Sequence, residues 1–343
     1  MTVTSVHTLI IGAGPAGLAA ATALARAGRE VVVLERLPTV GAKPCAGGIP
    51  AGGLAGELPR ELLERSFRQQ RVVTDRHDFT ISAPEPIIHT VDREKLGRWQ
   101  RQQAEAAGAK ILTATRALQI DHHQLESDRG SWRFSFLVGA DGSNSLVRRH
   151  LGLGLQRAGL GITYQVPGDF AEMEWHLNPA HFGNGYAWIF PHGASASVGV
   201  YAYRGVIRSH QLHEHFRQWA EQRGIKLADS HPRASLVSFD YRGARFGNIL
   251  LAGDAAGLAS GLTGEGIAAA IYSGRQVAAA ILADGEQPPD LSKLLRRHAI
   301  HRRLAVLSAK NSFARRLLLA TLVLALRRQL LGAGALELIK PDK

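Results

Sequence analysis

The stretch Gly12-Ala13-Gly14-Pro15-Ala16-Gly17 matches the pattern G-x-G-x-x-G and decides the fold. It follows the apolar run Val6–Ile11 directly and opens the alanine-rich segment Ala16–Ala27, which has the composition of a helix. In this strand–loop–helix context the first glycine permits a tight turn, the second lets the backbone approach a pyrophosphate, and the third lets helix and strand pack closely. The pattern predicts a Rossmann-type dinucleotide site.

A second apolar strand, Val31–Leu34, completes a βαβ unit. Glu35 ends this strand about 20 residues beyond the glycine loop, where a carboxylate accepts hydrogen bonds from an adenosine ribose. We therefore place Glu35 and Arg36 beside the cofactor. This unit alone does not distinguish FAD from NAD.

Two later segments favour FAD. Val138–Arg148 follows a strand and offers Asp141 in a glycine turn, and Leu250–Ala256 places Asp254 at the carboxyl end of another strand, where open α/β sheets bind ligands. Thr263–Gly266 then opens a helix whose N-terminus can stabilise negative charge. An extended dinucleotide needs contacts spread this widely. The residues that we expect at the cofactor from these segments are Asp141, Gly253, Asp254, Gly264, Gly266 and Ile267.

The cofactor domain is predicted to be discontinuous. Alternating, aromatic-containing segments between Leu155 and Arg242 predict an inserted antiparallel sheet, and the strand Asn248–Leu251 and the helix Glu265–Leu282 follow it. The glycine and proline density of Gly41–Gly56 predicts a long loop without regular structure. The fold class is α/β, α+β overall. The predicted domains are an FAD-binding domain at 1–60, 90–150 and 245–290, a substrate domain at 61–89 and 151–244, and a basic helical C-terminal region at 291–343.

Most of the net charge of +12 belongs to that C-terminal region. It contains four arginine pairs, and Leu317–Leu326 is an apolar run only about half as long as a bilayer-spanning helix. Such a basic helix either lies in the interface of an anionic membrane or docks a partner protein, or it packs on the cofactor domain with a solvated basic face. Nucleic acid is not an expected partner, because no base-reading motif accompanies the charge.

The single cysteine, Cys45, excludes an intrachain disulfide and a cysteine-ligated metal site, and the histidines lack metal-ligand spacing. The N-terminus has no basic stretch followed by a separate apolar run. We therefore expect no metal, and a cytoplasmic protein or one peripheral at the inner face of the membrane.

The three cofactor segments resemble the fingerprints of the para-hydroxybenzoate hydroxylase-like flavoprotein superfamily. Two further stretches resemble the geranylgeranyl reductase family more narrowly: Lys43–Pro50 is similar to its K-P-C-G-G loop, and Tyr186–Pro191 matches its Y-x-W-x-F-P motif. The resemblance covers roughly Val6 to Ala283. Ala46 and Gly261 depart from the family pattern, where glycine and proline are usual.

The resemblance implies that Glu35, Arg93, Asp254 and the glycine loop hold FAD, and that Cys45 lies beside its isoalloxazine ring. Cys45 is a candidate catalytic residue, although a lone cysteine is more often an inert small hydrophobe. The side chains of Tyr186, Trp188 and Phe190 alternate along the sequence and project to one face of a strand, toward either a substrate pocket or the core.

The resemblance also implies an activity, hydride transfer from reduced FAD to a carbon–carbon double bond of an apolar isoprenoid or lipid. The alternatives are a monooxygenase that hydroxylates an aromatic small molecule or a tryptophan of a partner polypeptide, and a non-catalytic flavoprotein. A second glycine-rich nucleotide motif is not evident, so NAD(P)H would bind transiently as the reductant, or another protein would reduce the flavin.

Overall fold

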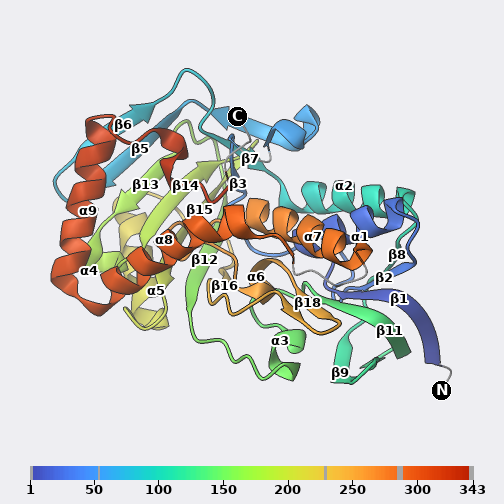
Figure 1. Cartoon of the computed structure of the whole chain (residues 1–343). Coiled ribbons are helices and arrows are strands. Elements are labelled where there is room, and N and C mark those ends of the chain that lie inside the picture. The colour runs from blue at the N-terminus through green and yellow to red at the C-terminus, as the bar shows by residue number, and fades with distance from the viewer. Residues whose placement is uncertain (1–2, 53–54, 228–229, 284–288, 340–343) are drawn as a thin grey trace.

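The computed structural model describes residues 3–52, 55–227, 230–283 and 289–339 (Figure 1). Residues 284–288 of the predicted FAD-binding domain and residues 340–343 of the predicted basic region lie outside the described residues. The described chain forms one mixed sheet of eight strands, a second sheet of seven and a small sheet of three, with helices packed around them.

The first sheet confirms the Rossmann-type prediction. Its five central strands run parallel in the order β18-β11-β1-β2-β8, and three further strands pair antiparallel at its margins. The central strands are β1 (Val3–Ile11), β2 (Val31–Leu34), β8 (Lys110–Leu112), β11 (Gly130–Gly139) and β18 (Ile249–Leu251), and the marginal strands are β9 (Ala117–Asp121), β10 (Gln124–Ser127) and β17 (Arg245–Phe246).

Three helices cover one face of this sheet: α1 (Pro15–Arg26), α2 (Arg93–Ala106) and α7 (Ile267–Leu282) (Figure 1). The helix α1 packs most of its alanines and Leu24 against Ile10 and Val33 in a buried cluster. Its small side chains let α7 approach closely, since a Cβ at Gly274 would lie 2.2 Å from the carbonyl oxygen of Ala16. Two short helices, α3 (Leu146–His150) and α6 (Gly253–Ala256), follow β11 and β18.

The second sheet is the predicted inserted sheet, in the order β16-β12-β15-β14-β13-β5-β6. Its neighbouring strands pair antiparallel, as predicted for the inserted sheet, except β13 and β5, which are parallel. Segments separated by about a hundred residues meet there, and no hairpin fixes their direction. The strands are β5 (Gln69–Thr74), β6 (Asp78–Ser82), β12 (Ala158–Pro167), β13 (Glu174–Leu177), β14 (Tyr186–Pro191), β15 (Ser195–Tyr203) and β16 (Arg233–Ser238).

The two faces of the second sheet have different neighbours. Ile189, Val198 and similar residues pack on α4 (Pro179–Phe182) and α5 (Ser209–Gln222). Trp188, Phe190 and Tyr201 belong to a separate cluster on the other face. Because α4 and α5 pack on the opposite face, the face that carries Trp188 can form one wall of a ligand site.

A small third sheet corrects the prediction for the loop Gly41–Gly56. Gly48–Pro50 forms β3, which pairs antiparallel with β7 (Ile88–Val91), and β7 also pairs with β4 (Leu63–Phe67). Burial of Ile49 in a cluster with Leu96 of α2 and Ile271 of α7 explains why a glycine- and proline-rich segment still forms a strand here. Short 3₁₀ turns lie at Ala55–Glu57 and Arg60–Leu62.

The predicted C-terminal helix is divided into α8 (Ser292–Lys310) and α9 (Ser312–Arg327). Asn311 separates them with an extended backbone, and its side chain accepts hydrogen bonds from the amides of Phe313 and Ala314. The helix α9 packs beside β6, and a 3₁₀ turn at Ala333–Leu336 then leads back toward the middle of the molecule (Figure 1). The domain boundaries themselves remain a prediction.

Candidate functional site

A cavity of about 750 Å³ extends from the glycine loop to the aromatic face of the second sheet. Gly12, Glu35 and Asp254 line one part of it, and Trp175 and Trp188 line another. Its volume lies within the usual range for cofactor and ligand sites.

The glycine loop is shaped by contacts that no side chain would allow. A Cβ at Gly12, whose φ is +101°, would lie 2.4 Å from the carbonyl oxygen of Ala140, and one at Gly17 would lie 2.0 Å from the carbonyl oxygen of Gly12. At Gly14 a Cβ would meet no described atom within 4 Å. The first and third glycines are therefore required by the protein itself, whereas the second faces open space in the cavity.

Glu35 is fixed at the end of β2 by two backbone amides. Its Oε2 accepts from the amide of Ala13 and its Oε1 from the amide of Leu37, both at 2.8 Å. The carboxylate thereby joins the glycine loop to the second strand, in the position that a ribose-binding acid needs.

Two buried polar groups of the cavity wall lack partners among the described residues, which fits a bound dinucleotide. The Nε and Nη1 atoms of Arg93 at the start of α2 and the Oδ1 atom of Asp141 after β11 have no hydrogen-bond partner there. The other carboxylate oxygen of Asp141 accepts from the amide of Leu146 at 2.6 Å, and burial raises the pKa of this carboxyl. Buried groups of this kind are costly unless a ligand or water satisfies them.

Asp254 lies directly after β18 and connects three distant segments. Its Oδ2 accepts from Lys43 Nζ at 2.7 Å and from Ser143 Oγ at 3.1 Å. Gly266, which precedes α7, faces the same carboxylate, since a Cβ there would lie 3.3 Å from Oδ1. The predicted second and third cofactor segments therefore meet at one point.

Aromatic side chains form the wall of the cavity on the second sheet. Successive ring centroids of Tyr186, Trp188 and Phe190 are 6.0 and 6.4 Å apart, and Trp175 and Tyr201 contact Tyr186 from either side. Burial raises the pKa of the Tyr186 hydroxyl, which donates to the carbonyl oxygen of Thr263 at 2.5 Å. The three predicted aromatic residues thus line the same cavity wall, in which Trp188 and Phe190 are buried and Tyr186 is half-buried.

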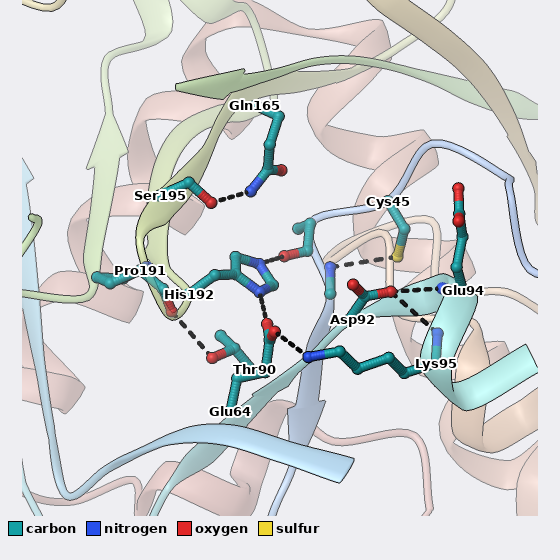
Figure 2. A network of polar contacts seen from close by, with 12 residues as sticks. Cys45, Glu64, Thr90, Asp92, Glu94, Lys95, Gln165, Pro191, His192 and Ser195 are labelled. Atoms are coloured by element: carbon teal, nitrogen blue, oxygen red, sulfur yellow. Dashed lines mark hydrogen bonds and ion pairs between the residues drawn. The ribbon is translucent and has the colours of Figure 1, made fainter. Parts of the chain in front are cut away.

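A histidine holds the loop that carries Cys45 (Figure 2). His192 Nδ1 lies 2.6 Å from Glu64 Oε2, and its Nε2 lies 3.1 Å from the carbonyl oxygen of Ala46. His192 therefore links Glu64, which lies in β4 of the third sheet, to the backbone of the loop that follows Cys45. The thiol of Cys45 lines the cavity and accepts from the amide of Gly47 at 3.4 Å.

Glu265 adds an acid to the cavity wall. Its Oε2 accepts from the amide of Leu338 at 3.0 Å, and its buried Oε1 has no partner among the described residues. Burial raises the pKa of Glu265 to about 7, and the nearby carboxylate of Glu337 adds to this rise. Glu265, Cys45 and Tyr186 all line this cavity.

All the predicted site residues except Gly17 line this one cavity. They are Gly12, Gly14, Ala16, Glu35, Arg36, Cys45, Arg93, Asp141, Tyr186, Trp188, Phe190, Gly253, Asp254, Gly264, Gly266 and Ile267. The sequence did not reveal a role for His192 or Glu64, nor for the C-terminal residues Leu336 and Glu337, which also line the cavity. The departure Gly261 is explained by packing, because a Cβ there would lie 2.7 Å from the ring of Phe239.

Comparisons with known proteins agree with this geometry. Residues 5–223 match a family model described as an FAD binding domain. Digeranylgeranylglycerophospholipid reductase 2 of Methanosphaera stadtmanae is 30% identical over 319 residues, which cover 81% of this chain and 79% of that protein. The chain belongs to the geranylgeranyl reductase family.

Other members of the geranylgeranyl reductase family are similarly related. The geranylgeranyl diphosphate reductase of Rhodobacter capsulatus is 29% identical, with 82% of this chain and 77% of that protein covered. The chloroplastic enzyme of the same name from Oryza sativa is also 29% identical over 80% of this chain, which spans 66% of that relative. Membership of the family makes the chain an FAD-dependent oxidoreductase, as the sequence predicts.

Solved structures share the fold. A geranylgeranyl bacteriochlorophyll reductase-like protein of Thermoplasma acidophilum superposes with a TM-score of 0.77 at 20% identity, covering 96% of this chain and 99% of that one. PqsL of Pseudomonas aeruginosa, solved with 2-aminobenzoylacetate, has a TM-score of 0.68 at 19% identity, covering 89% and 95%. The predicted fold class is confirmed.

Proposed function

We propose that this chain reduces a carbon–carbon double bond of an apolar isoprenoid or lipid substrate. The observation that carries the proposal is the aromatic wall, which lines the same cavity as the glycine loop. The names of the sequence relatives support it, because those proteins are reductases of geranylgeranyl compounds. The monooxygenase alternative has support only from more distant proteins that share the fold.

The residues around the glycine loop would hold FAD, which when bound and reduced supplies a hydride. The backbone at Gly14 would face the pyrophosphate, and Glu35 would accept from the ribose. The unpartnered guanidinium of Arg93 and the carboxylate of Asp254 would contact polar parts of the same molecule. Together these groups fix the position of the cofactor along the cavity.

The aromatic wall would exclude water from the reacting carbons and bind the substrate chain. Tyr186, Trp188 and Phe190 present ring surfaces, and their polar atoms are satisfied within the protein, for example by the bond from Trp188 Nε1 to Ser197 Oγ at 3.2 Å. A surface of this kind binds an alkyl or isoprenyl chain through burial of apolar area and offers few polar contacts.

Glu265 would supply the proton that the reduction needs. Addition of a hydride to one carbon of the double bond leaves the second carbon to take a proton, and Oε1 of Glu265 can hold one near neutral pH because its pKa is raised to about 7. After donation the carboxylate regains a proton from solvent. Cys45 is the second candidate for this proton, since its thiol lines the same cavity.

We further propose a cytoplasmic enzyme that works at the inner face of the membrane, where its substrate resides. A transiently bound nicotinamide nucleotide or a reducing protein would return the flavin to its reduced state. No helix among the described residues is long and apolar enough to cross a bilayer.

Narrowing the aromatic cavity is expected to discriminate between substrates by chain length. Val237 of β16 lines the cavity and is only partly buried, so Val237→Trp adds a ring to the space beside the wall. We expect KM to rise by about tenfold for a geranylgeranyl chain, because overpacking costs about 1–3 kcal/mol. A short prenyl chain should be affected much less. Steady-state kinetics with both substrates checks this, and equal losses for both would contradict a chain-binding role for the wall.

Anaerobic turnover tests the proposed function. The purified protein with bound FAD is reduced chemically without oxygen and mixed with geranylgeranyl diphosphate or a geranylgeranyl lipid, and the product is analysed by mass spectrometry. A gain of two hydrogen atoms for each reduced double bond is expected. Absence of this product, together with the oxygen-dependent gain of one oxygen atom by an aromatic substrate, would overturn the reductase proposal in favour of a monooxygenase.

A further inference from the structure

The helix α9 presents an apolar stripe to solvent. Phe313, Leu317 and Leu324 lie on its outer side with exposed fractions of 72, 56 and 50%. Val323 and Leu326 on the inner side are buried, so α9 is anchored to the molecule and the outer stripe is not its packing face. Leu330, which follows the helix, is also exposed, by 74%.

Positive charge surrounds this stripe. The pairs Arg315-Arg316 and Arg327-Arg328 stand at the two ends of α9, and the sequence from Ser292 to Arg328 contains no acidic residue. Arg327 contacts His77 at the turn between β5 and β6, with Nη1 and Nδ1 3.3 Å apart, whereas Arg316 and Arg328 point into solvent. A convex helix with an apolar centre and cationic ends complements a surface that is anionic outside and apolar beneath, as an anionic bilayer is.

The inner side of the same helix reaches the substrate cavity. Leu326 lines the cavity together with Ile81 of β6, which packs beside α9. The exposed stripe and the cavity wall are therefore opposite sides of one helix. Figure 1 shows α9 standing next to β5 and β6, at the far end of the molecule from the N-terminus.

We propose that the outer face of α9 docks on an anionic phospholipid bilayer, and that the substrate chain passes from the bilayer into the cavity beside α9. The arginine pairs would contact lipid headgroups, and Phe313, Leu317 and Leu324 would enter the interface between headgroups and acyl chains. The entry route rests on the proposed function, because it assumes a lipid substrate. The docking does not, since it follows from the exposed stripe and its charge.

Vesicle cosedimentation tests the docking with the full chain. The protein is expected to bind vesicles of phosphatidylcholine mixed with phosphatidylglycerol about tenfold more tightly than vesicles of phosphatidylcholine alone, and to lose binding as salt is raised. The double substitution Leu317→Glu and Leu324→Glu should weaken binding by tenfold or more. Val3→Glu is the matched control, since Val3 is 45% exposed at the start of β1, and it should bind as the unaltered protein does.

Equal binding to both kinds of vesicle, or unchanged binding by the Leu317 and Leu324 double variant, would overturn the docking proposal. Capture of an acidic protein by α9 without vesicle binding would also overturn it, in favour of a protein partner. Turnover of a detergent-solubilised substrate by the double variant separates the two proposals. Retained turnover with lost vesicle binding supports the docking face, whereas vesicle binding without turnover of any isoprenoid contradicts the proposed function alone.

Discussion

Replacement of Gly14 by valine is expected to give a folded protein that purifies without FAD. The backbone at Gly14 is already extended, with φ −78° and ψ 178°, so a β-branched residue fits the chain there. The new side chain meets no described atom of the protein within 4 Å at its Cβ and instead projects into the space that the pyrophosphate needs. Overpacking of this kind costs about 1–3 kcal/mol, which corresponds to a loss of about 10- to 100-fold in FAD affinity.

Absorbance of the bound flavin and far-ultraviolet circular dichroism check this result together. Gly154→Val is the matched control, because Gly154 also has open space around its Cβ but lies outside the cavity; this variant should keep its flavin. Gly12→Ala should lose both flavin and stability, since its Cβ would collide with Ala140. A Gly14→Val protein with a full complement of FAD would contradict the assignment of the glycine loop.

The second large effect is expected at Glu265. Glu265→Gln preserves the shape of the side chain and an oxygen that can accept from the amide of Leu338, but it cannot release a proton. Loss of a general acid typically lowers the rate by about 10²–10⁴-fold, and we expect kcat to fall within that range while KM changes little. Steady-state kinetics at pH 6 and pH 8, with FAD content measured in parallel, checks the split between kcat and KM.

The pH dependence of kcat provides a second test of the role of Glu265. The proton on Glu265 is present below a pKa of about 7, so kcat of the unaltered protein should fall as pH rises through about 7. Glu265→Gln should remove this decline. The free energy of unfolding depends on the same proton. Because folding raises the pKa of Glu265 from 4.5 to about 7, the protonated side chain contributes to stability fully below about pH 4.5, and this contribution is lost as pH rises to about 7. The variant should therefore unfold with a weaker pH dependence over this range.

Cys45→Ala separates the two candidate acids. The thiol makes one hydrogen bond, at 3.4 Å, so its removal should leave FAD binding intact. If Glu265 is the proton donor, Cys45→Ala keeps most of the turnover. A large loss in Cys45→Ala with little loss in Glu265→Gln would reverse the assignment.

The cofactor half of the site could be predicted because its signals are local in the sequence. The glycine loop, the strand before it and Glu35 lie within one βαβ unit, and the first and third glycines are required by close backbone contacts with Ala140 and Gly12. Asp141 and Asp254 follow strands whose parallel order brings their carboxyl ends to one edge of the sheet. Apolar runs and turn residues therefore sufficed to place them.

The remaining contacts depend on residues far apart in the chain. His192 and Glu64 are separated by 128 residues, and Lys43 and Asp254 by 211, so no periodicity or spacing connects either pair. A histidine directly after the aromatic motif has no distinctive neighbours in the sequence. The parallel pairing of β13 with β5 was missed for the same reason, since long-range strand order is not encoded in local alternation.

The position of Leu336 and Glu337 in the cavity wall has a consequence for the order of events during synthesis. The glycine loop is made among the first residues, whereas the segment that caps Glu265 and supplies Glu337 to the same wall follows α9. A nascent chain in which this segment has not yet left the ribosome has an incomplete cavity. Completion of the cavity wall beside Glu265 therefore follows translation of α9.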